Sequence, residues 1–261
     1  MPILTMTTDW GIKDSYVASF KGFILRKLPG ALMVDITHEL NNYNIIEAAY
    51  VLGTSFSSFP EGTIHFIGLD SGGGPAVGKE TNYLVAKFQG HLFIGADSGV
   101  FSMIFQEKEF SSWKLPIQNN TSTKEILSEI SGAICKLLSG TSPDQLGEKF
   151  NKLHASHFPR PAADPSGIRC SVIYIDSFGN AVVNVTRDQF EKIRNGRSCT
   201  IIARRSTINK ISTGYHQVEE GDFLALFNQH DFLELSLNKD DASKLIGLKI
   251  LDSILIEFHD R

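Results

Sequence analysis

A carboxylate followed by glycines, at the end of an apolar run, is the segment of this chain best suited to chemistry. Residues 64–75 read IHFIGLDSGGGP, in which the apolar run predicts a buried strand, Asp70 follows it, and glycines and a proline close the loop. Ligands of open α/β sheets bind outside the carboxyl ends of the strands, and glycine lets the backbone approach a ligand closely. The segment is therefore a candidate site, although a tight turn in which Asp70 caps its own backbone explains the same residues.

A second carboxylate, Asp9, follows the apolar and β-branched residues 2–8, which also predict a strand. If both strands belong to one sheet, Asp9 and Asp70 lie at its carboxyl edge. Both oxygens of a carboxylate accept hydrogen bonds, so Asp9 could hold the two hydroxyls of a ribose. The alternative is that Asp9 caps the helix expected to begin near Asp14.

The segment YIDSFGNAVVN at residues 174–184 brings further polar and aromatic groups into one predicted turn between two strands. A plain hairpin explains Gly179 and Asn180, but it requires neither Asp176 nor an exposed Phe178. Asp176 could receive an ammonium group, Phe178 could stack on a flat ring, and Asn180 could pair with the edge of a base. These groups suit a nucleoside joined to an amino acid, and the plain hairpin remains the alternative.

Other chemistry finds little support in the residue pattern. His38 ends the stretch ALMVDITH and is interpreted as a structural histidine, which a lone histidine at a strand end usually is. The sequence contains no HExxH, no carboxylate–histidine cluster and no Cys/His spacing, so no metal site is predicted. The GxxxxGK[ST], GxSxG and GxGxxG fingerprints are absent as well.

Composition bounds the remaining classes. The 261 residues are 42% hydrophobic and 21% charged with a net charge of −4, which suits one large domain or two modest ones and gives no sign of a nucleic-acid partner. No stretch reaches the roughly 18 apolar residues that span a bilayer, so no membrane partner is predicted. Three widely spaced cysteines, without a CxxC pair, are expected to be reduced thiols of a cytoplasmic protein.

Strands and helices alternate in the first part of the chain, which is typical of a mostly parallel sheet covered by helices. Apolar runs predict strands and 3.6-residue periodicity predicts helices. The expected strands are 2–8, 31–36, 63–69, 82–88 and 91–95, and the expected helices are 14–28, 44–56 and 123–138.

The pattern changes after residue 155. Residues 156–167 are rich in proline and without periodicity, which predicts a linker. From residue 168 to residue 261, short strands separated by turns indicate an antiparallel barrel or sandwich. We therefore expect an α/β domain over residues 1–155 and a small all-β domain over residues 168–261.

Six blocks of sequence, spread over nearly the whole chain, occur in the order of the motifs of one known family. They are TTDWGIKDSYVASFKGFI (7–24), VDITHEL (34–40), FPEGTIHFIGLDSGGGP (59–75), GADSGV (95–100), YIDSFGNAVVN (174–184) and FLELSLNKDDASKLIGLKILDSILI (232–256). Through these blocks the chain resembles the S-adenosyl-L-methionine (SAM) hydroxide adenosyltransferases, the adenosine-forming SAM hydrolases related to fluorinases and chlorinases. The resemblance implies a Rossmann-like domain with a mixed or parallel sheet, a C-terminal antiparallel β-barrel, and a homotrimer with sites between subunits.

The resemblance also implies roles for single residues. Asp9 matches the carboxylate that holds the ribose hydroxyls, and Tyr43 falls where relatives carry an aromatic residue lining the ribose pocket. Asp176 matches the group that contacts the methionine amine. Asn180 matches an adenine contact, and Phe178 lies in the same turn.

Asp70 matches the first member of an Asp–Arg–His set that positions the attacking water, but the rest of that set differs. Val77 stands where the arginine is expected, and Glu125 lies near the position of the histidine. Without the arginine, the positive charge that would lower the pKa of Asp70 is missing. Glu125 could supply a second carboxylate, which would raise one pKa of the pair if the two groups were close.

The family reaction displaces methionine from the ribose C5′ of SAM by water or hydroxide, giving adenosine and L-methionine. The leaving group is a neutral thioether, so catalysis rests on positioning and desolvating the nucleophile. We expect a SAM hydrolase with an incomplete Asp–Arg–His set, for which SAM is the substrate and no cofactor is needed. The alternatives are a non-catalytic SAM- or adenosine-binding protein, and a pocket re-specialised for another nucleoside or nucleophile.

Overall fold

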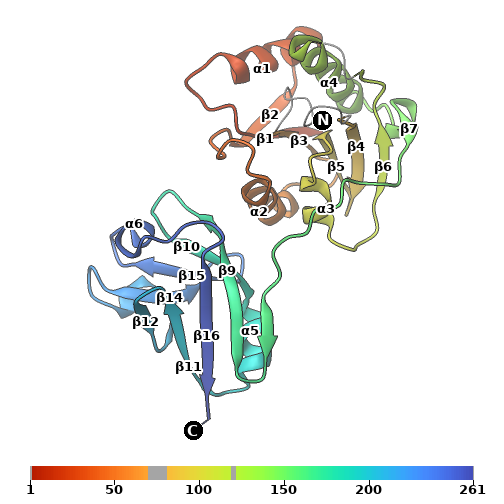
Figure 1. Cartoon of the computed structure of the whole chain (residues 1–261). Helices are drawn as coiled ribbons and strands as arrows, with labels where there is room; N and C mark the ends of the chain where they lie inside the picture. The colour runs from red at the N-terminus through yellow and green to blue at the C-terminus, as the bar shows by residue number, and fades with distance from the viewer. Residues whose placement is uncertain (1, 70–80, 119–121, 261) are drawn as a thin grey trace. The chain divides into compact units, whose positions relative to one another are not determined.

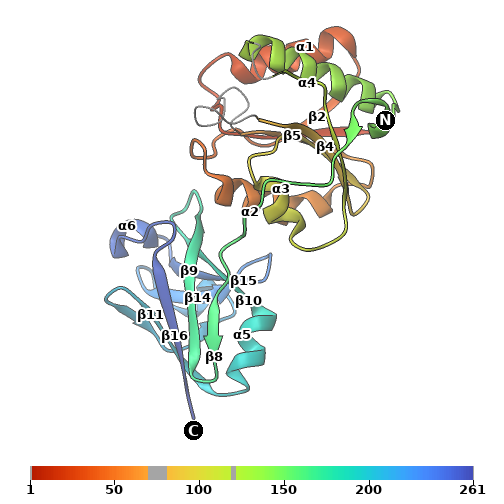
Figure 2. The ribbon, with the colours of Figure 1, turned by 45° about the vertical axis from the view of Figure 1, so that its right-hand side comes forward.

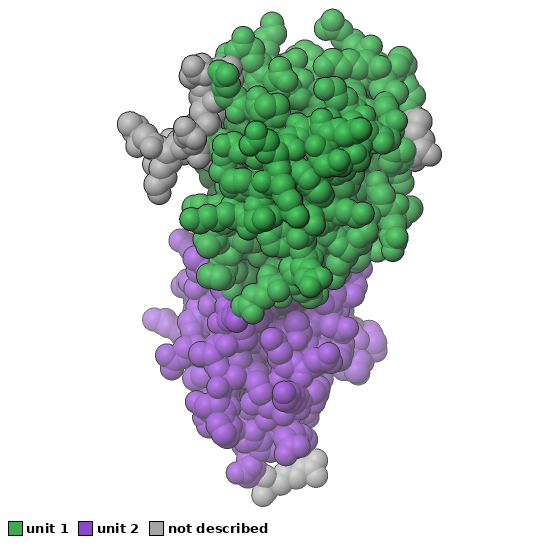
Figure 3. Space-filling view, turned by 90° about the vertical axis from the view of Figure 1, so that its right-hand side faces the viewer, with its two compact units in different colours: residues 1–158 green, residues 159–261 purple. Residues whose placement is uncertain are grey.

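The chain divides into two compact units, residues 1–158 and residues 159–261 (Figure 3). The computed structural model describes residues 2–69, 81–118 and 122–260. The division falls within the stretch 156–167, but part of that stretch is strand rather than linker, because β8 (Ala162–Asp164) pairs with the start of β9 (Gly167–Ile175). None of the helices in the described ranges has the length and apolar character needed to cross a bilayer.

The first unit contains a seven-stranded mixed sheet with the order β2-β1-β3-β5-β4-β6-β7. Strands β2, β1, β3 and β5 run parallel to one another, and β4, β6 and β7 continue the sheet antiparallel. The strands are β1 (Ile3–Thr8), β2 (Leu32–Thr37), β3 (Ile64–Gly68), β4 (Tyr83–Phe88), β5 (His91–Ala96), β6 (Ser111–Lys114) and β7 (Glu148–Lys149).

Helices cover both faces of this sheet (Figures 1 and 2). On one face, α1 (Tyr16–Lys27) and α4 (Thr123–Leu138) bury residues such as Phe20 against the strands. On the other face, α2 (Ile45–Ser55) and α3 (Val100–Phe105) enclose a second core that contains Phe93. The 3₁₀ turns of this unit are Phe56–Ser58 and Pro143–Gln145. The alternating strands and helices of the sequence thus form a Rossmann-like layered domain.

The second unit is built around a nine-stranded sheet that curls into a barrel-like form, with the order β12-β11-β16-β9-β10-β15-β14-β13 and β8 attached to β9 (Figure 1). Its strand pairs are antiparallel apart from β13 with β14. The remaining elements are β10 (Ala181–Thr186), α5 (Arg187–Arg194), β11 (Ser198–Ala203), β12 (Ser206–Ile208), β13 (Ile211–Ser212), the 3₁₀ turn Tyr215–Gln217, β14 (Phe223–Phe227), β15 (Phe232–Leu237), α6 (Ala242–Ile246) and β16 (Ser253–His259). The expected fold class is therefore confirmed.

Candidate functional site

Three neighbouring parallel strands of the first unit end together at one edge of the sheet. Thr8 of β1 pairs with Gly68 of β3, and Ile67 of β3 pairs with Gly95 of β5. Asp9 follows the first of these strands at this edge. Asp70 and Val77 lie outside the described residues.

Asp9 hydrogen-bonds to the loop that carries Tyr43 and does not cap α1. Its Oδ2 accepts the backbone N–H of Tyr43 at 3.0 Å, and among the described residues Oδ1 has no hydrogen-bond partner. The N-cap of α1 is Ser15, so the alternative role for Asp9 as a cap is wrong. Tyr43 adopts a positive φ of 61° and leaves 69% of its surface exposed. The structure thus brings Asp9 together with the backbone of Tyr43, whose side chain is exposed.

Close packing fixes the turn that carries Asp9. A Cβ added at Gly68 would lie 2.6 Å from Thr8 Cγ2 and 2.9 Å from Trp10 Cζ2, so only glycine fits there. The indole of Trp10 packs edge-on against Phe20 and Phe66, with ring centroids 5.4 and 5.6 Å apart. Asp9 is therefore flanked on both sides by residues that the core holds in place.

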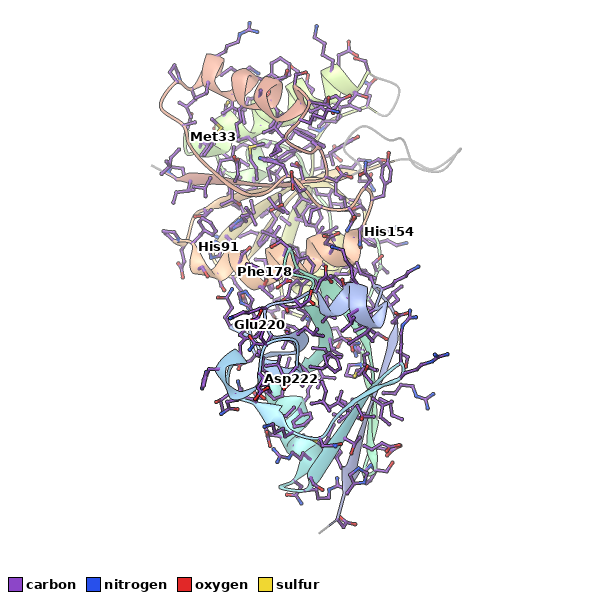
Figure 4. The ribbon with its side chains drawn as sticks, turned by 90° about the vertical axis from the view of Figure 1, so that its left-hand side faces the viewer. Met33, His91, His154, Phe178, Glu220 and Asp222 are labelled. Atoms are coloured by element: carbon purple, nitrogen blue, oxygen red, sulfur yellow. The ribbon has the colours of Figure 1, made fainter. Side chains whose placement is uncertain are left out.

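Asp97, which sequence reasoning did not select, is a further carboxylate at this edge. Asp97 directly follows β5, just as Asp9 directly follows β1. This position after an apolar strand is the feature of the sequence from which Asp97 could have been predicted as a site residue. Its Oδ2 accepts the backbone N–H of His154 at 2.8 Å (His154 is labelled in Figure 4), whereas Oδ1 is buried and has no hydrogen-bond partner among the residues that the structure describes. Burial raises the pKa of Asp97, and the N–H and charge of His154 only partly oppose this. Such a carboxyl binds a proton more readily than an exposed one.

Glu125 lies at the third position of α4 and takes part in a capping box. Its Oε2 accepts the backbone N–H and the hydroxyl of Ser122, both at 2.8 Å, while the Ser122 hydroxyl accepts the Glu125 N–H. The Ser122 N–H and hydroxyl lower the pKa of Glu125, which is the opposite direction to that expected of one member of a close carboxylate pair. Glu125 therefore has a local structural role, and its catalytic role remains a prediction.

The turn between β9 and β10 brings Asp176, Phe178 and Asn180 together. Asp176 Oδ1 accepts the backbone N–H groups of Phe178 and Asn180, and Oδ2 accepts the Asn180 side-chain amide, each at 2.9 Å. Phe178 is 76% exposed on this turn (Figure 4), whereas Asn180 is buried. The Asp176 carboxylate thus shapes a turn that presents an aromatic ring to solvent.

A partly buried polar network supports this turn. The Asn180 amide lies 3.4 Å from the Tyr215 hydroxyl, which donates to Glu234 Oε1 at 2.6 Å, and the Ser236 hydroxyl donates to the same oxygen at 2.8 Å. Burial and the neighbouring Glu234 raise the pKa of Tyr215 to about 12. Because a carboxylate only accepts, the NH₂ of Asn180 faces Asp176, and the amide oxygen points elsewhere. The alternation of Glu234 and Ser236 with leucines along β15 was the one sequence signal for this network.

No group of metal-ligating side chains is arranged to hold an ion in the part of the chain that the structure describes. The three cysteines are free and buried. Burial raises the pKa of the Cys170 thiol to about 12, so it is not a reactive thiolate at neutral pH. The polar groups at the strand ends and the β9–β10 turn are therefore the principal candidates for ligand contacts.

Comparison with known families identifies the chain. The model of the SAM hydroxide adenosyltransferase N-terminal domain matches residues 4–147, and that of the C-terminal domain matches residues 170–255. The chain belongs to the SAM hydroxide adenosyltransferase family. The resemblance drawn from the six sequence blocks is thereby confirmed.

Individual relatives of this SAM hydroxide adenosyltransferase family member are similar over most of its length. An (R)-S-adenosyl-L-methionine hydrolase of Methanocaldococcus jannaschii is 28% identical, covering 98% of this chain and 96% of the relative. A fluorinase of Actinoplanes sp. is 23% identical over 73% of this chain and 74% of the relative. An uncharacterized conserved protein from Thermotoga maritima superposes with a TM-score of 0.87 at 24% identity, covering 97% of this chain and 99% of that chain, which shows the shared fold.

Proposed function

We propose that this protein hydrolyses SAM at the ribose C5′ to give adenosine and L-methionine. The observation that carries the proposal is the Asp9 carboxylate at the sheet edge, where Oδ2 accepts the Tyr43 N–H and Oδ1 has no hydrogen-bond partner among the described residues. Membership of the family over both units and the similarity to hydrolases of the same length support it.

In this proposal each candidate residue contacts a different group of the ligand. Asp9 accepts hydrogen bonds from the ribose diol and Tyr43 lines the ribose. Asp176 attracts the methionine ammonium, Asn180 contacts adenine and Phe178 packs against the ligand. Each contact uses a group whose chemistry suits its partner, since carboxylates accept from hydroxyls and attract cations.

The reaction does not require a general acid. A neutral thioether leaves from a sulfonium, so its departure needs no proton. We assign Asp70 and Glu125 to orienting the attacking water. SAM is the substrate and no cofactor takes part.

We further propose a cytoplasmic homotrimer in which sites lie between subunits. The family resemblance carries this step, and sedimentation velocity of the purified chain tests it. A single species at three times the monomer mass is the expected result, whereas a monomer that still turns over SAM would contradict shared sites.

Chromatography of products after incubation with SAM tests the activity itself. Adenosine and methionine are expected in equal amounts. Glu125→Gln and Asp70→Asn should each lower turnover, and glutamine at this helix position keeps the capping box. Unchanged turnover in both variants would remove these two residues from the mechanism.

A second candidate is a non-catalytic SAM- or adenosine-binding protein, which the use of Glu125 as a helix cap favours. Isothermal titration calorimetry with adenosine and SAM, run beside the product assay, separates the two. Tight binding without products would establish the binding protein. Absence of both binding and products would leave a pocket re-specialised for another nucleoside or nucleophile.

A further inference from the structure

A chain of polar contacts runs from the surface of the first unit to the turn that carries Asp9. Lys21 Nζ donates to Asp35 Oδ2 at 2.6 Å, and Asp35 Oδ1 lies 3.1 Å from His38 Nε2. His38 Nδ1 lies 2.8 Å from Thr8 Oγ1, and the backbone N–H of Trp10 points to the same oxygen at 3.4 Å. His38 is thus the link between a charged pair on the surface and the end of β1.

The ring of His38 is oriented by its two neighbours. The Nε2 contact with Asp35 is electrostatic rather than a well-aligned hydrogen bond. Because an unprotonated nitrogen would repel a carboxylate at this distance, we assign a proton to Nε2. In a neutral ring Nδ1 then accepts the Thr8 O–H, which leaves the hydroxyl oxygen to accept from Trp10.

Asp35 remains a carboxylate in this arrangement. Partial burial raises its pKa, but the hydrogen bond from Lys21 together with the close contact and charge of His38 more than offset that effect and hold the pKa below its ordinary value. A permanent negative charge beside Nε2 keeps the imidazole in one orientation.

The backbone of His38 also contacts the turn that carries Asp9, in addition to the contact of its side chain with Thr8. Its carbonyl oxygen accepts the N–H of Gly11 at 2.6 Å, and Gly11 has a φ of 67°. The Thr8 carbonyl oxygen in turn accepts the N–H of Leu40 at 3.4 Å. The two segments are therefore tied on both sides of Asp9.

A second threonine–histidine pair on β1 shows what a purely structural pair looks like. Thr5 Oγ1 lies 2.7 Å from His65 Nδ1, and His65 Nε2 lies 3.2 Å from Nδ1 of His91 (labelled in Figure 4), among aromatic rings. No carboxylate hydrogen-bonds to His65 within the described residues. Thr5 and Thr8 are both fully buried, so burial does not distinguish the two pairs. They differ in the neighbour of the histidine, which is the carboxylate of Asp35 for His38 and the imidazole of His91 for His65.

We propose that His38 is a positioning residue for Asp9: through the Thr8 hydroxyl and its own carbonyl oxygen, it holds residues 8–11 in the conformation that presents the Asp9 carboxylate to a ribose. This inference rests on the proposed function, because it takes the ligand to be SAM or adenosine. Lys21 and Asp35 act through His38 and touch no ligand.

Thr8→Val tests the proposal, since valine keeps the shape of threonine but removes the hydroxyl. Its Kd for adenosine and KM for SAM should rise about tenfold, with kcat within about threefold, because the misplaced group binds ribose. Thr8→Ser restores the hydroxyl and should restore both constants. Thr5→Val makes the same change in the other pair and should lower stability without moving either constant.

Hydrogen exchange of the peptides that contain Gly11 and Tyr43 provides a readout that needs no ligand. Thr8→Val should speed exchange there about fivefold or more, whereas Thr8→Ser and Thr5→Val should not. If the unmodified protein binds no adenosine, the proposed function fails, while exchange still decides whether His38 positions the turn.

Two results overturn the proposal. One is equal adenosine binding and exchange by Thr8→Val and Thr5→Val, and the other is failure of Thr8→Ser to restore what Thr8→Val loses. If Thr8→Val does not fold, Lys21→Ala decides, because Lys21 is partly exposed and lies furthest from the turn. It should weaken adenosine binding about two- to threefold, as expected for loss of one charged anchor, and unchanged binding would overturn the proposal.

Discussion

Asp9 and Asp176 both follow a strand, but the two regions use a carboxylate in different ways. Within the described part of the chain, Asp9 accepts one backbone N–H and its other oxygen has no hydrogen-bond partner, whereas Asp176 accepts three hydrogen bonds from its own turn. The first carboxylate is our proposed ribose contact, and the second shapes the backbone of its turn and fixes the Asn180 amide. An aspartate that follows a strand can thus serve as a proposed ligand contact alone, as Asp9 does, or shape its own turn as well, as Asp176 does, and the hydrogen bonds distinguish the two cases.

The largest expected effect comes from Asp9→Ala. Adenosine binding should weaken about 100-fold or more, because two charge-assisted hydrogen bonds to the ribose are lost. The melting temperature should change little, since among the described residues the Asp9 side chain hydrogen-bonds only to the backbone N–H of Tyr43. Titration calorimetry and thermal unfolding measure the two quantities. Affinity within threefold of the unmodified protein would mean that Asp9 does not bind the ribose.

Asp176→Ala should show the opposite balance. Loss of three hydrogen bonds to a carboxylate should lower the unfolding free energy of the second unit by about 2 kcal/mol. Asp176→Asn is the matched control, because its amide oxygen still accepts the two backbone N–H groups and should retain about half of that energy. Urea unfolding measures both variants. A stable Asp176→Ala protein that fails to bind SAM would instead make Asp176 a pure ligand contact.

Base selectivity tests the fixed amide of Asn180. With its NH₂ held by Asp176, Asn180 offers an oxygen to the ligand, so adenosine should bind about tenfold more tightly than inosine, which carries an acceptor in place of the amino group. Competition titration with the two nucleosides measures the ratio. Asp176→Asn loosens the amide and should reduce the ratio, and equal affinities in the unmodified protein would exclude the proposed adenine contact.

The smallest expected effect is a pH dependence at the network beneath this turn. The fold raises the pKa of Tyr215 from 10.0 to about 12, so the stability that it contributes is complete below pH 10 and is lost as the pH rises through 12. Because Tyr215 is 40% exposed, solvent screening reduces this contribution to about 1 kcal/mol. Urea unfolding of the unmodified protein and of Tyr215→Phe measures the effect. The difference between their unfolding free energies should be smaller at pH 11 than at pH 8. A constant difference would exclude the linkage.

Local patterns predicted most of the fold. The periodic stretches around α1 and α4 are long and amphipathic, so their limits are correct to within two residues. The six-residue α3 and the four-residue β6 are too short to show a period, and they depend on packing that the sequence does not display.

The residues of the candidate site likewise include some that the local sequence predicts and others that it does not. Asp9 and Asp176 are visible in sequence because each follows an apolar strand. Asp97 was missed although it has the same local pattern, because its distinguishing feature is a buried oxygen created by distant packing around His154. Tyr215 meets Asn180 from 35 residues away, and no local pattern encodes that contact.

Gly68 also limits how this protein can be altered. No side chain fits between the end of β1 and the indole of Trp10, so a library that randomises the strand ends to change ligand choice must keep this position fixed. Even one methyl group there would displace Thr8 and Trp10, the neighbours of Asp9. Such a library should instead vary exposed side chains such as Tyr43 and Phe178, whose replacement does not displace the buried residues.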